Sequence, residues 1–207
     1  MNRNSLKIAL AAILIFCASA MADEDEAPAV AETKKVDTAA VMKRVYNFRG
    51  GINFSSAYNS RNVLGFHVGG MADIPLTLVD LGNEAYLLEF HVGAQFVKKG
   101  GKYRYYSFLN GYYSRSFDAY YLEAPVPFSF KKTFSENISA RVDFGPYIAF
   151  GLFGTQKSFD ELSRFDAGII YGTVIDFAKK YSLGVHVGTG LSDDDIDSFY
   201  MTLSYKL

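Results

Sequence analysis

The chain has 207 residues, of which 49% are hydrophobic, 16% aromatic and 21% charged, so it can bury a sizeable core, and a disordered chain is excluded. Its 21 basic and 22 acidic residues give a formal net charge of -1, which offers no long-range field for gathering nucleic acid, so that partner is not expected. The 18 Gly, the 15 Tyr and, apart from Phe16, the 18 Phe all lie at or after Tyr46. One stretch of the chain therefore carries the unusual composition.

Residues 1-22 have the pattern of an export signal. Arg3 and Lys7 form a basic start, the apolar run 8-17 is too short to span a bilayer comfortably, and the small residues that follow end at Ala22. We expect cleavage after Ala22, which removes the only Cys of the chain. The mature protein can then hold neither a disulfide nor a Cys-ligated metal.

Residues 23-46 are rich in Ala, Glu, Asp and Lys and contain no Gly. This composition predicts a mostly disordered periplasmic linker, because such a segment has little apolar surface to bury. A short helix around Thr38 to Arg44 is the alternative. Residues 47-207 form the folded domain.

From Asn47 onward, apolar residues recur at every second position in about eight segments, which is typical of β-strands. Each segment has about 9 to 15 residues, longer than a usual soluble strand and suited to a tilted strand that crosses a membrane. The predicted strands are 48-56, 64-74, 86-96, 120-131, 138-152, 165-177, 181-191 and 199-207.

The non-apolar face of these strands identifies the interior of the fold. It carries many glycines, which weaken a solvated strand face but make room for large side chains inside a narrow barrel. On the apolar face, aromatic residues gather near both strand ends, as in the girdles of outer-membrane barrels. We therefore predict an all-β fold, a small up-and-down antiparallel transmembrane β-barrel of about eight strands. A soluble lipocalin-like binding barrel with the apolar face inside is the alternative.

The connections between the strands predict the orientation. Short turns are expected at 75-83, 132-137 and 178-180, and the opposite end has connections at 57-62, 98-117, 154-164 and 192-197, two of them long. Long loops lie outside the cell in such barrels, so both ends of the folded domain are expected in the periplasm. The predicted location is the outer membrane.

Four short segments of this sequence resemble one known family. They are Gly50 to Phe54, Gly65 to Gly69, Tyr121 to Pro125, and Phe165 to Gly168 followed by Gly172. Across residues 47-207 they resemble the PorT-type outer-membrane β-barrel family, most specifically in the Tyr-Leu-Glu-x-Pro run. The resemblance implies an outer-membrane barrel, with some relatives linked to protein secretion, and it implies no catalytic residues.

Charged residues on the inward face are expected to pair with one another and to fill the lumen, since such charges lose much of their hydration there. A narrow pore for small solutes is the alternative function, although this strand number leaves little open channel. The predicted polar network of the lumen consists of Arg49, Asp73, Glu89, Glu123, Lys131, Arg141, Asp143, Asp166, Asp176 and Lys206.

Three inward histidines, His67, His91 and His186, could hold zinc together with Glu89. Packed neutral residues are the simpler interpretation, so no metal and no cofactor are predicted. Catalysis is not expected either, because no histidine falls in an external loop. The acidic run Asp193 to Asp195, with Asp197, is interpreted as a solvated turn, with calcium binding as the alternative.

The predicted external loop 98-117 combines cations with tyrosines. Such a surface suits the phosphates and sugars of lipopolysaccharide or an envelope protein partner. A strand pair that extends above the membrane is the alternative. The overall prediction is a monomeric envelope protein in outer-membrane lipid, with a structural or interaction role that is linked to secretion only through the family resemblance. The candidate binding residues of the loop are Lys99, Lys102, Arg104, Tyr105 and Tyr106.

Overall fold

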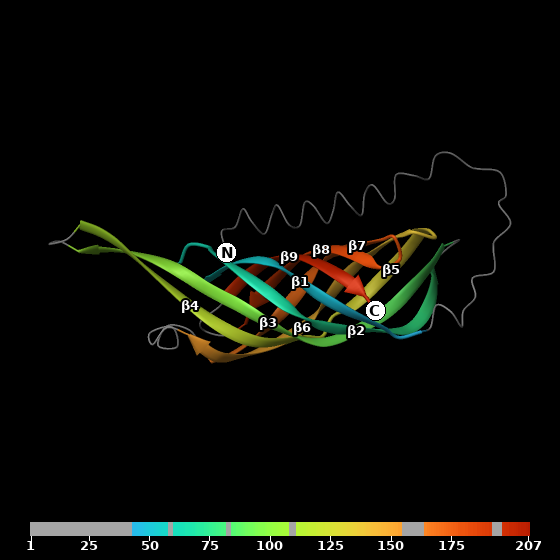
Figure 1. Ribbon diagram of the computed structural model, residues 1–207, viewed down its shortest axis with the longest axis horizontal. Coiled ribbons are helices and arrows are strands. Elements are labelled where there is room, and N and C mark those ends of the chain that lie inside the picture. The colour runs from blue at the N-terminus through green and yellow to red at the C-terminus, as the bar shows by residue number, and fades with distance from the viewer. Residues whose placement is uncertain (1–42, 58–59, 82–83, 108–110, 155–163, 192–195) are drawn as a thin grey trace. The chain divides into compact units, whose positions relative to one another are not determined.

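The computed structural model describes residues 43-57, 60-81, 84-107, 111-154, 164-191 and 196-207 (Figure 1). The predicted signal peptide and nearly all of the predicted linker lie outside these residues. No helix in the described part of the chain is long and apolar enough to cross a membrane. The strands are β1 (Val45–Ala57), β2 (Val63–Leu81), β3 (Glu84–Ser107), β4 (Gly111–Pro125), β5 (Phe128–Ser135), β6 (Ile138–Gly154), β7 (Phe165–Phe177), β8 (Tyr181–Gly190) and β9 (Ile196–Lys206).

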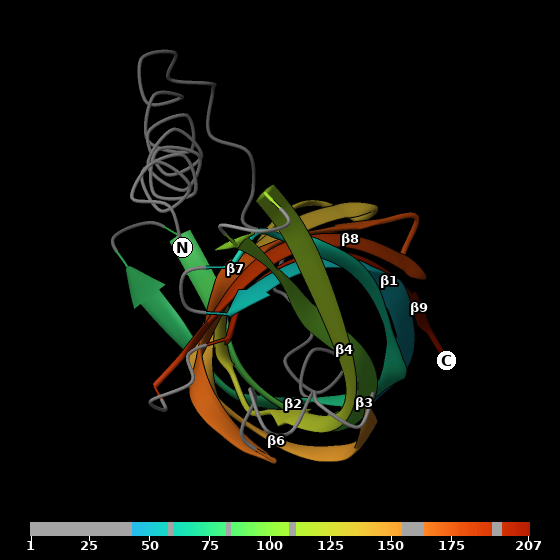
Figure 2. The same cartoon turned by 90° about the vertical axis from the view of Figure 1, so that its left-hand side faces the viewer.

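The strands pair antiparallel in one closed sheet. β1 pairs with β2 on one side and with β9 on the other, so the sheet has no free beginning, and Figure 2 shows the resulting ring of strands. β4 and β5 share one place in the wall, because β3 and β6 each pair with β4 along one part and with β5 along another. Nine strands with one shared place give the eight positions of a small barrel, which confirms the predicted fold class.

The sequence pattern predicts one unbroken strand from 120 to 131. In the structure this strand is divided into β4, which ends at Pro125, and β5, which begins at Phe128. Pro125 and Pro127 carry no N–H group, so neither can donate a ladder hydrogen bond. The wall nevertheless stays closed at the break. The Val126 amide donates to the Pro146 carbonyl oxygen at 2.8 Å, and the His91 amide donates to the Pro127 carbonyl oxygen at 2.9 Å.

At one end of the barrel, β1 begins at Val45 and β9 ends at Lys206; we call this the terminal end. The predicted turn 178-180 is confirmed, with Ala178 and Lys179 at φ of 51° and 61°. The predicted turn 75-83 is wrong in extent, because β2 continues to Leu81 past a register shift between Pro75 and Thr77. The turn predicted at 132-137 is likewise shorter, since β5 runs to Ser135.

The predicted external loop 98-117 is wrong, and the alternative of an extended strand pair is correct. β3 runs to Ser107 and β4 begins at Gly111, with regular pairing from Lys98 opposite Tyr120 to Ser107 opposite Gly111. Tyrosine favours extended structure, so pairing continues past the apolar part of the strands. The hairpin projects beyond the other strands at the left of Figure 1, and we call this the hairpin end.

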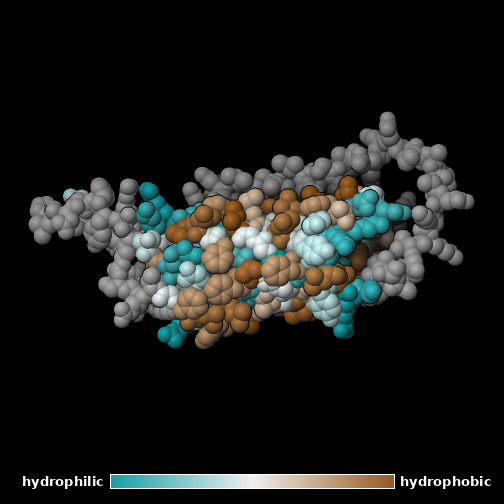
Figure 3. Space-filling model, in the orientation of Figure 1, coloured by the Kyte–Doolittle hydropathy of each residue, from teal (hydrophilic) through white to brown (hydrophobic). Residues whose placement is uncertain are grey.

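Burial separates the two faces of the wall. Outward apolar side chains are exposed, with Phe144 at 60% and Leu203 at 55%, whereas inward polar residues such as Asn53 and Glu123 are fully buried. Figure 3 shows hydrophobic residues across the middle of the surface and hydrophilic residues toward both ends. A lipocalin-like barrel needs the opposite arrangement, so that alternative is wrong.

Inward glycines make room for large inward side chains, as predicted. A Cβ at Gly168 would lie 2.1 Å from the Thr189 carbonyl oxygen and 2.6 Å from the ring of Tyr147. A Cβ at Gly51 would lie 1.9 Å from the Met201 carbonyl oxygen. At these positions the neighbouring strand and an aromatic ring occupy the space that any other residue would need.

Candidate functional site

Toward the hairpin end, the lumen is filled by an ion-pair triad on three strands. Lys99 of β3 places its Nζ 2.7 Å from Glu123 Oε2 of β4 and 3.0 Å from Asp166 Oδ2 of β7. The three side chains are 0%, 0% and 1% exposed. Charges buried this deeply are tolerated only when they are paired and hydrogen-bonded.

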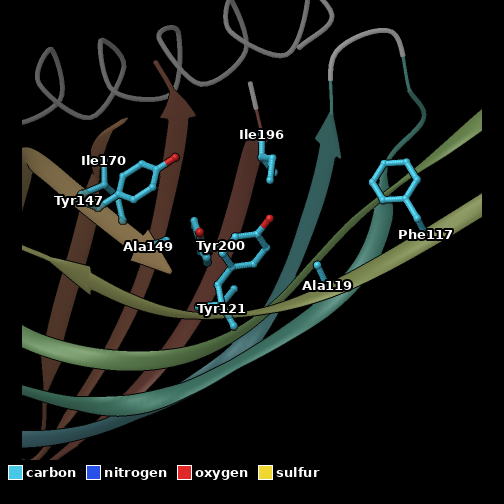
Figure 4. Packing of buried hydrophobic residues seen from close by; sticks show 9 residues of the cluster. Phe117, Ala119, Tyr121, Tyr147, Ala149, Ile170, Ile196 and Tyr200 are labelled. Carbon is cyan, nitrogen blue, oxygen red and sulfur yellow. The ribbon is translucent and has the colours of Figure 1, made fainter. Parts of the chain in front are cut away.

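Neutral donors complete this triad. Gln95 Nε2 donates to Glu123 Oε1 at 2.6 Å, and the Tyr200 hydroxyl donates to Glu123 Oε2 at 3.1 Å. The Tyr147 hydroxyl donates to Asp166 Oδ2 at 3.2 Å, while its ring lies 4.7 Å from Lys99 Nζ. Figure 4 shows Tyr147 and Tyr200 within a group of buried hydrophobic residues. We call Lys99, Glu123, Asp166 and these donors the Lys99 cluster.

Lys99 is a correction to the sequence prediction, which placed it on an exposed binding surface. Positions 95, 97 and 99 of β3 all face the lumen, so the strand period continues through Lys99 instead of ending before it. The signal was present in the sequence, because His91 and Gln95 lie on the same face at the same period. A Lys next to the predicted loop boundary was assigned to solvent because of its charge.

Toward the terminal end, Arg141 of β6 lies among three carboxylates. Its Nε is 3.3 Å from Asp143 Oδ1, and its Nη1 is 3.5 Å from Asp73 Oδ2 and 3.9 Å from Asp176 Oδ1. Asp73, Asp143 and Asp176 come from β2, β6 and β7. One guanidinium therefore connects three walls of the lumen, because its donors point in several directions at once.

Two lysines add further positive charge at this end. Asp176 lies 3.1 Å from Lys131 Nζ and 2.7 Å from Lys206 Nζ, and Lys131 also approaches Glu89 at 3.8 Å. Their side chains are 18% and 13% exposed, so water reaches this margin of the network. We call Arg141, Asp73, Asp143, Asp176, Lys131, Lys206, Glu89 and the histidine chain described next the Arg141 cluster.

A chain of hydrogen bonds crosses the Arg141 cluster from β2 to β8. His91 Nδ1 lies 2.7 Å from Asp73 Oδ1, and His91 Nε2 lies 2.5 Å from Ser129 Oγ. The Ser129 hydroxyl donates to Asp143, whose other oxygen lies 2.9 Å from His186 Nε2. The Ser129 hydroxyl therefore stands between the Asp143 carboxylate and the His91 ring, and it joins β5 to both β6 and β3.

Asp73, His91 and Ser129 are residue types of a nucleophilic triad, but their setting differs from one. Ser129 is fully buried, and its hydroxyl proton is directed to Asp143 rather than to His91. In this arrangement the Ser129 hydroxyl links Asp143 to the His91 ring within the hydrogen-bond chain.

The three histidines have separate partners. His67 Nε2 lies 3.0 Å from Thr202 Oγ1, whereas His91 and His186 belong to the hydrogen-bond chain. In the described ranges, no group of three or more His, Cys, Asp or Glu side chains is arranged to hold a metal ion. The acidic run 193-195 lies outside those ranges.

The structure brings most of the predicted lumen network into the two clusters. Arg49 instead lines a cavity of about 10 Å³ together with Asn47 and Arg141, which is room for about one water molecule. Sequence reasoning missed Lys99, Gln95, Ser129, Tyr147 and Tyr200 as members. Glu123 and Asp166 belong to the Lys99 cluster, and Asp73, Glu89, Lys131, Arg141, Asp143, Asp176 and Lys206 belong to the Arg141 cluster.

The predicted binding surface of the hairpin is only partly described. Lys102 is exposed and Tyr106 is 66% exposed, whereas the side chains of Arg104 and Tyr105 lie outside the described part of the structure. Lys102 forms a backbone bridge with Arg61, and each amide donates to the other residue's carbonyl oxygen at 3.1 and 2.9 Å. This bridge joins the hairpin to the segment that precedes β2.

Outward aromatic residues gather at both ends of the apolar surface. Toward the hairpin end, the rings of Phe96 and Tyr120 stack at 5.6 Å, and those of Tyr120 and Phe153 stack at 4.8 Å. Toward the terminal end, the ring of Tyr181 lies 5.9 Å from Phe177 and 5.5 Å from Tyr205. These positions suit the two interfaces of a bilayer.

Comparison with known proteins gives one family match. Residues 37–194 match the model of the family described as "Outer membrane protein beta-barrel domain". A search of curated proteins finds no match to the sequence.

Several solved barrels have a similar fold. The attachment invasion locus protein Ail of Yersinia pestis, solved with the heparin analogue sucrose octasulfate, is 12% identical over 80% of this chain and 100% of its own, with a TM-score of 0.41. The outer membrane enzyme PagL is 13% identical over the same shares, with a TM-score of 0.48. A designed transmembrane β-barrel is 11% identical over 79% of this chain and 95% of its own, with a TM-score of 0.34.

Proposed function

Because the chain belongs to the outer membrane protein β-barrel domain family, we propose that it is a non-conducting barrel with a structural or interaction role in the cell envelope. Its partners in this proposal are outer-membrane lipid, lipopolysaccharide and an envelope protein. The resemblance to PorT-type barrels adds a link to protein secretion. This link is more specific than the family match, which indicates only an outer-membrane β-barrel domain. The proposal includes export by the leader 1-22 and a monomeric barrel.

The filled lumen is the observation that carries this proposal. The Lys99 cluster closes the interior toward the hairpin end with a triad that is at most 1% exposed and with the rings of Tyr147 and Tyr200. The Arg141 cluster occupies the terminal end with paired charges. Solute passage would require both clusters to separate, and each broken buried pair costs about 3-5 kcal/mol.

Planar-bilayer recording of the refolded protein tests this proposal. We expect no conductance steps from the native barrel. A variant with Tyr147→Ala and Tyr200→Ala loses two large side chains of the Lys99 cluster only. It is also expected not to conduct, because the Arg141 cluster still occupies the terminal end; heat-modifiable migration on gels checks that it has refolded. Regular single-channel steps from the native protein would contradict the proposal and favour the narrow pore.

The orientation is tested by surface labelling of whole cells. A cysteine at the exposed Tyr106 is expected to react with an impermeant maleimide, whereas one at Lys179, in the turn between β7 and β8, is expected to stay unlabelled until the outer membrane is opened. Labelling at Lys179 alone would invert the orientation. N-terminal sequencing of the mature protein checks the cleavage after Ala22.

A further inference from the structure

Two exposed cations lie directly opposite each other near the hairpin end. Arg61 and Lys102 are exposed and form an isolated antiparallel bridge, so their side chains leave the same face of the pair. Like charges directly opposite each other are destabilising. The structure thus places two positive charges side by side where a bound anion would relieve their repulsion.

This pair lies on the outside of the wall. Gly101 faces the lumen, since a Cβ there would meet the side chains of Phe117 and Ser60 at 2.5 and 2.6 Å. Lys102 therefore faces outward, as Lys98 does four positions earlier. Lys98 pairs with Asp118 at 3.0 Å, whereas among the described residues no acidic side chain lies within ion-pair distance of Arg61 or Lys102.

Outward aromatic rings lie nearer the middle of the barrel than the cation pair, and Phe96 is six positions before Lys102 on β3, about 20 Å at about 3.3 Å per residue. The Phe66 ring is 6.2 Å from that of Phe96 and 6.4 Å from that of Tyr120, and Phe153 continues the group onto β6. Such rings mark the membrane interface. Lys102 lies four residues beyond Lys98, about 13 Å along β3 at about 3.3 Å per residue.

We propose that Arg61 and Lys102 form an anion site for the phosphorylated headgroup of an outer-leaflet glycolipid, whose acyl chains cover Phe66, Phe96, Tyr120 and Phe153. This inference rests on the proposed function, because it needs the hairpin end to face outward. Cations farther out and lipid-facing rings nearer the middle lie on one outward face, which favours a lipid over a protein, since both halves of one amphiphile are matched. The guanidinium and the ammonium suit a phosphate that bears two charges.

The test measures the binding of fluorescent lipopolysaccharide to refolded barrels in zwitterionic detergent. The variant R61Q/K102Q is compared with K43Q/R44Q, which removes one Lys and one Arg, both exposed, at the opposite end of the barrel. We expect about a tenfold loss of affinity for R61Q/K102Q and no more than a twofold loss for the control. Dephosphorylated lipopolysaccharide is expected to abolish the difference, and so is high salt, which screens exposed charges.

Three results would overturn the inference. Equal loss in both variants would indicate a response to net charge alone. Equal binding of phosphatidylglycerol would show that a simple phospholipid headgroup suffices. Unchanged lipopolysaccharide binding by R61Q/K102Q, together with loss of a crosslink that the native barrel forms to an envelope protein, would assign the pair to a protein partner. Because conductance is recorded separately, a failure of this site is distinguishable from a failure of the proposed non-conducting role.

Discussion

The Lys99 cluster and the Arg141 cluster fill the same lumen but distribute their charge differently. In the Lys99 cluster, one cation serves both Glu123 and Asp166, and the three side chains are at most 1% exposed. In the Arg141 cluster, the single carboxylate of Asp176 lies within 4 Å of three cations, those of Arg141, Lys131 and Lys206. The side chains of Lys131 and Lys206 are partly exposed.

This difference concerns redundancy. When Arg141 is lost, Asp176 keeps two further cations, Lys131 and Lys206. Asp73 keeps Asn47 at 2.9 Å and the ring of His91, and Asp143 keeps Ser129 and the ring of His186. Glu123 and Asp166 keep neutral hydrogen-bond donors. Within the described residues, however, Lys99 is the only cation that lies within ion-pair distance of either carboxylate. A fully buried charge without a countercharge is costly, so the two clusters should respond unequally to losing their central cation.

The largest effect is expected from Lys99→Met. It leaves two buried carboxylates without a countercharge, and we expect a loss of about 4-5 kcal/mol in the free energy of unfolding. Denaturant titration of the barrel in lipid vesicles measures it. The triple variant with Glu123→Gln and Asp166→Asn should recover most of the loss, because no buried charge remains. An unchanged midpoint for Lys99→Met would show that water reaches the triad.

Arg141→Met should cost less, about 3 kcal/mol in the same titration, although Arg141 approaches three carboxylates rather than two. Lys131 and Lys206 remain beside Asp176 and compensate part of the charge. A loss equal to or larger than that of Lys99→Met would contradict the redundancy of this cluster.

Gly168→Ala probes the Lys99 cluster through its packing. The added methyl group would press on the ring of Tyr147, whose hydroxyl donates to Asp166, and we expect a loss of about 2 kcal/mol from overpacking. Gly70→Ala is the matched control, since a Cβ there meets its nearest neighbour, the Asn47 carbonyl oxygen, at an ordinary 3.7 Å. The control should change stability by no more than about 0.5 kcal/mol. Equal effects in the two variants would refute the packing explanation.

The smallest effect is expected from Lys131→Gln at the hydrated margin of the Arg141 cluster. The side chain is 18% exposed, and Asp176 keeps Lys206 at 2.7 Å, so a loss of about 1 kcal/mol or less is expected. Raising the salt concentration should reduce even this difference, because water and ions screen this margin. A loss that matches Arg141→Met would show that the margin is as dry as the centre.

The sequence predicted the lumen better than the surface of the hairpin. Asp143 and Asp166 were assigned to the lumen from the period of two alone, because a strand in a closed wall has only two faces. The sequence does not identify Arg61 as a candidate binding residue. Its place in the proposed anion site depends on its bridge to Lys102, which lies outside the regular register of β2 and β3. The sequence pattern misplaces Lys99, because a charged residue just beyond an apolar run is also typical of the place where a strand ends.

The sequence by itself determined the class of fold, because alternation over strand-length segments leaves few architectures that bury one face and present the other to lipid. Only the tertiary structure decided which charges pair. The partners Lys99 and Asp166 lie 67 positions apart. They meet because closure of the barrel sets the stagger between β3 and β7, and no local pattern encodes that stagger. The tertiary structure likewise decided that β4 ends at Pro125, where the wall passes to β5 without opening.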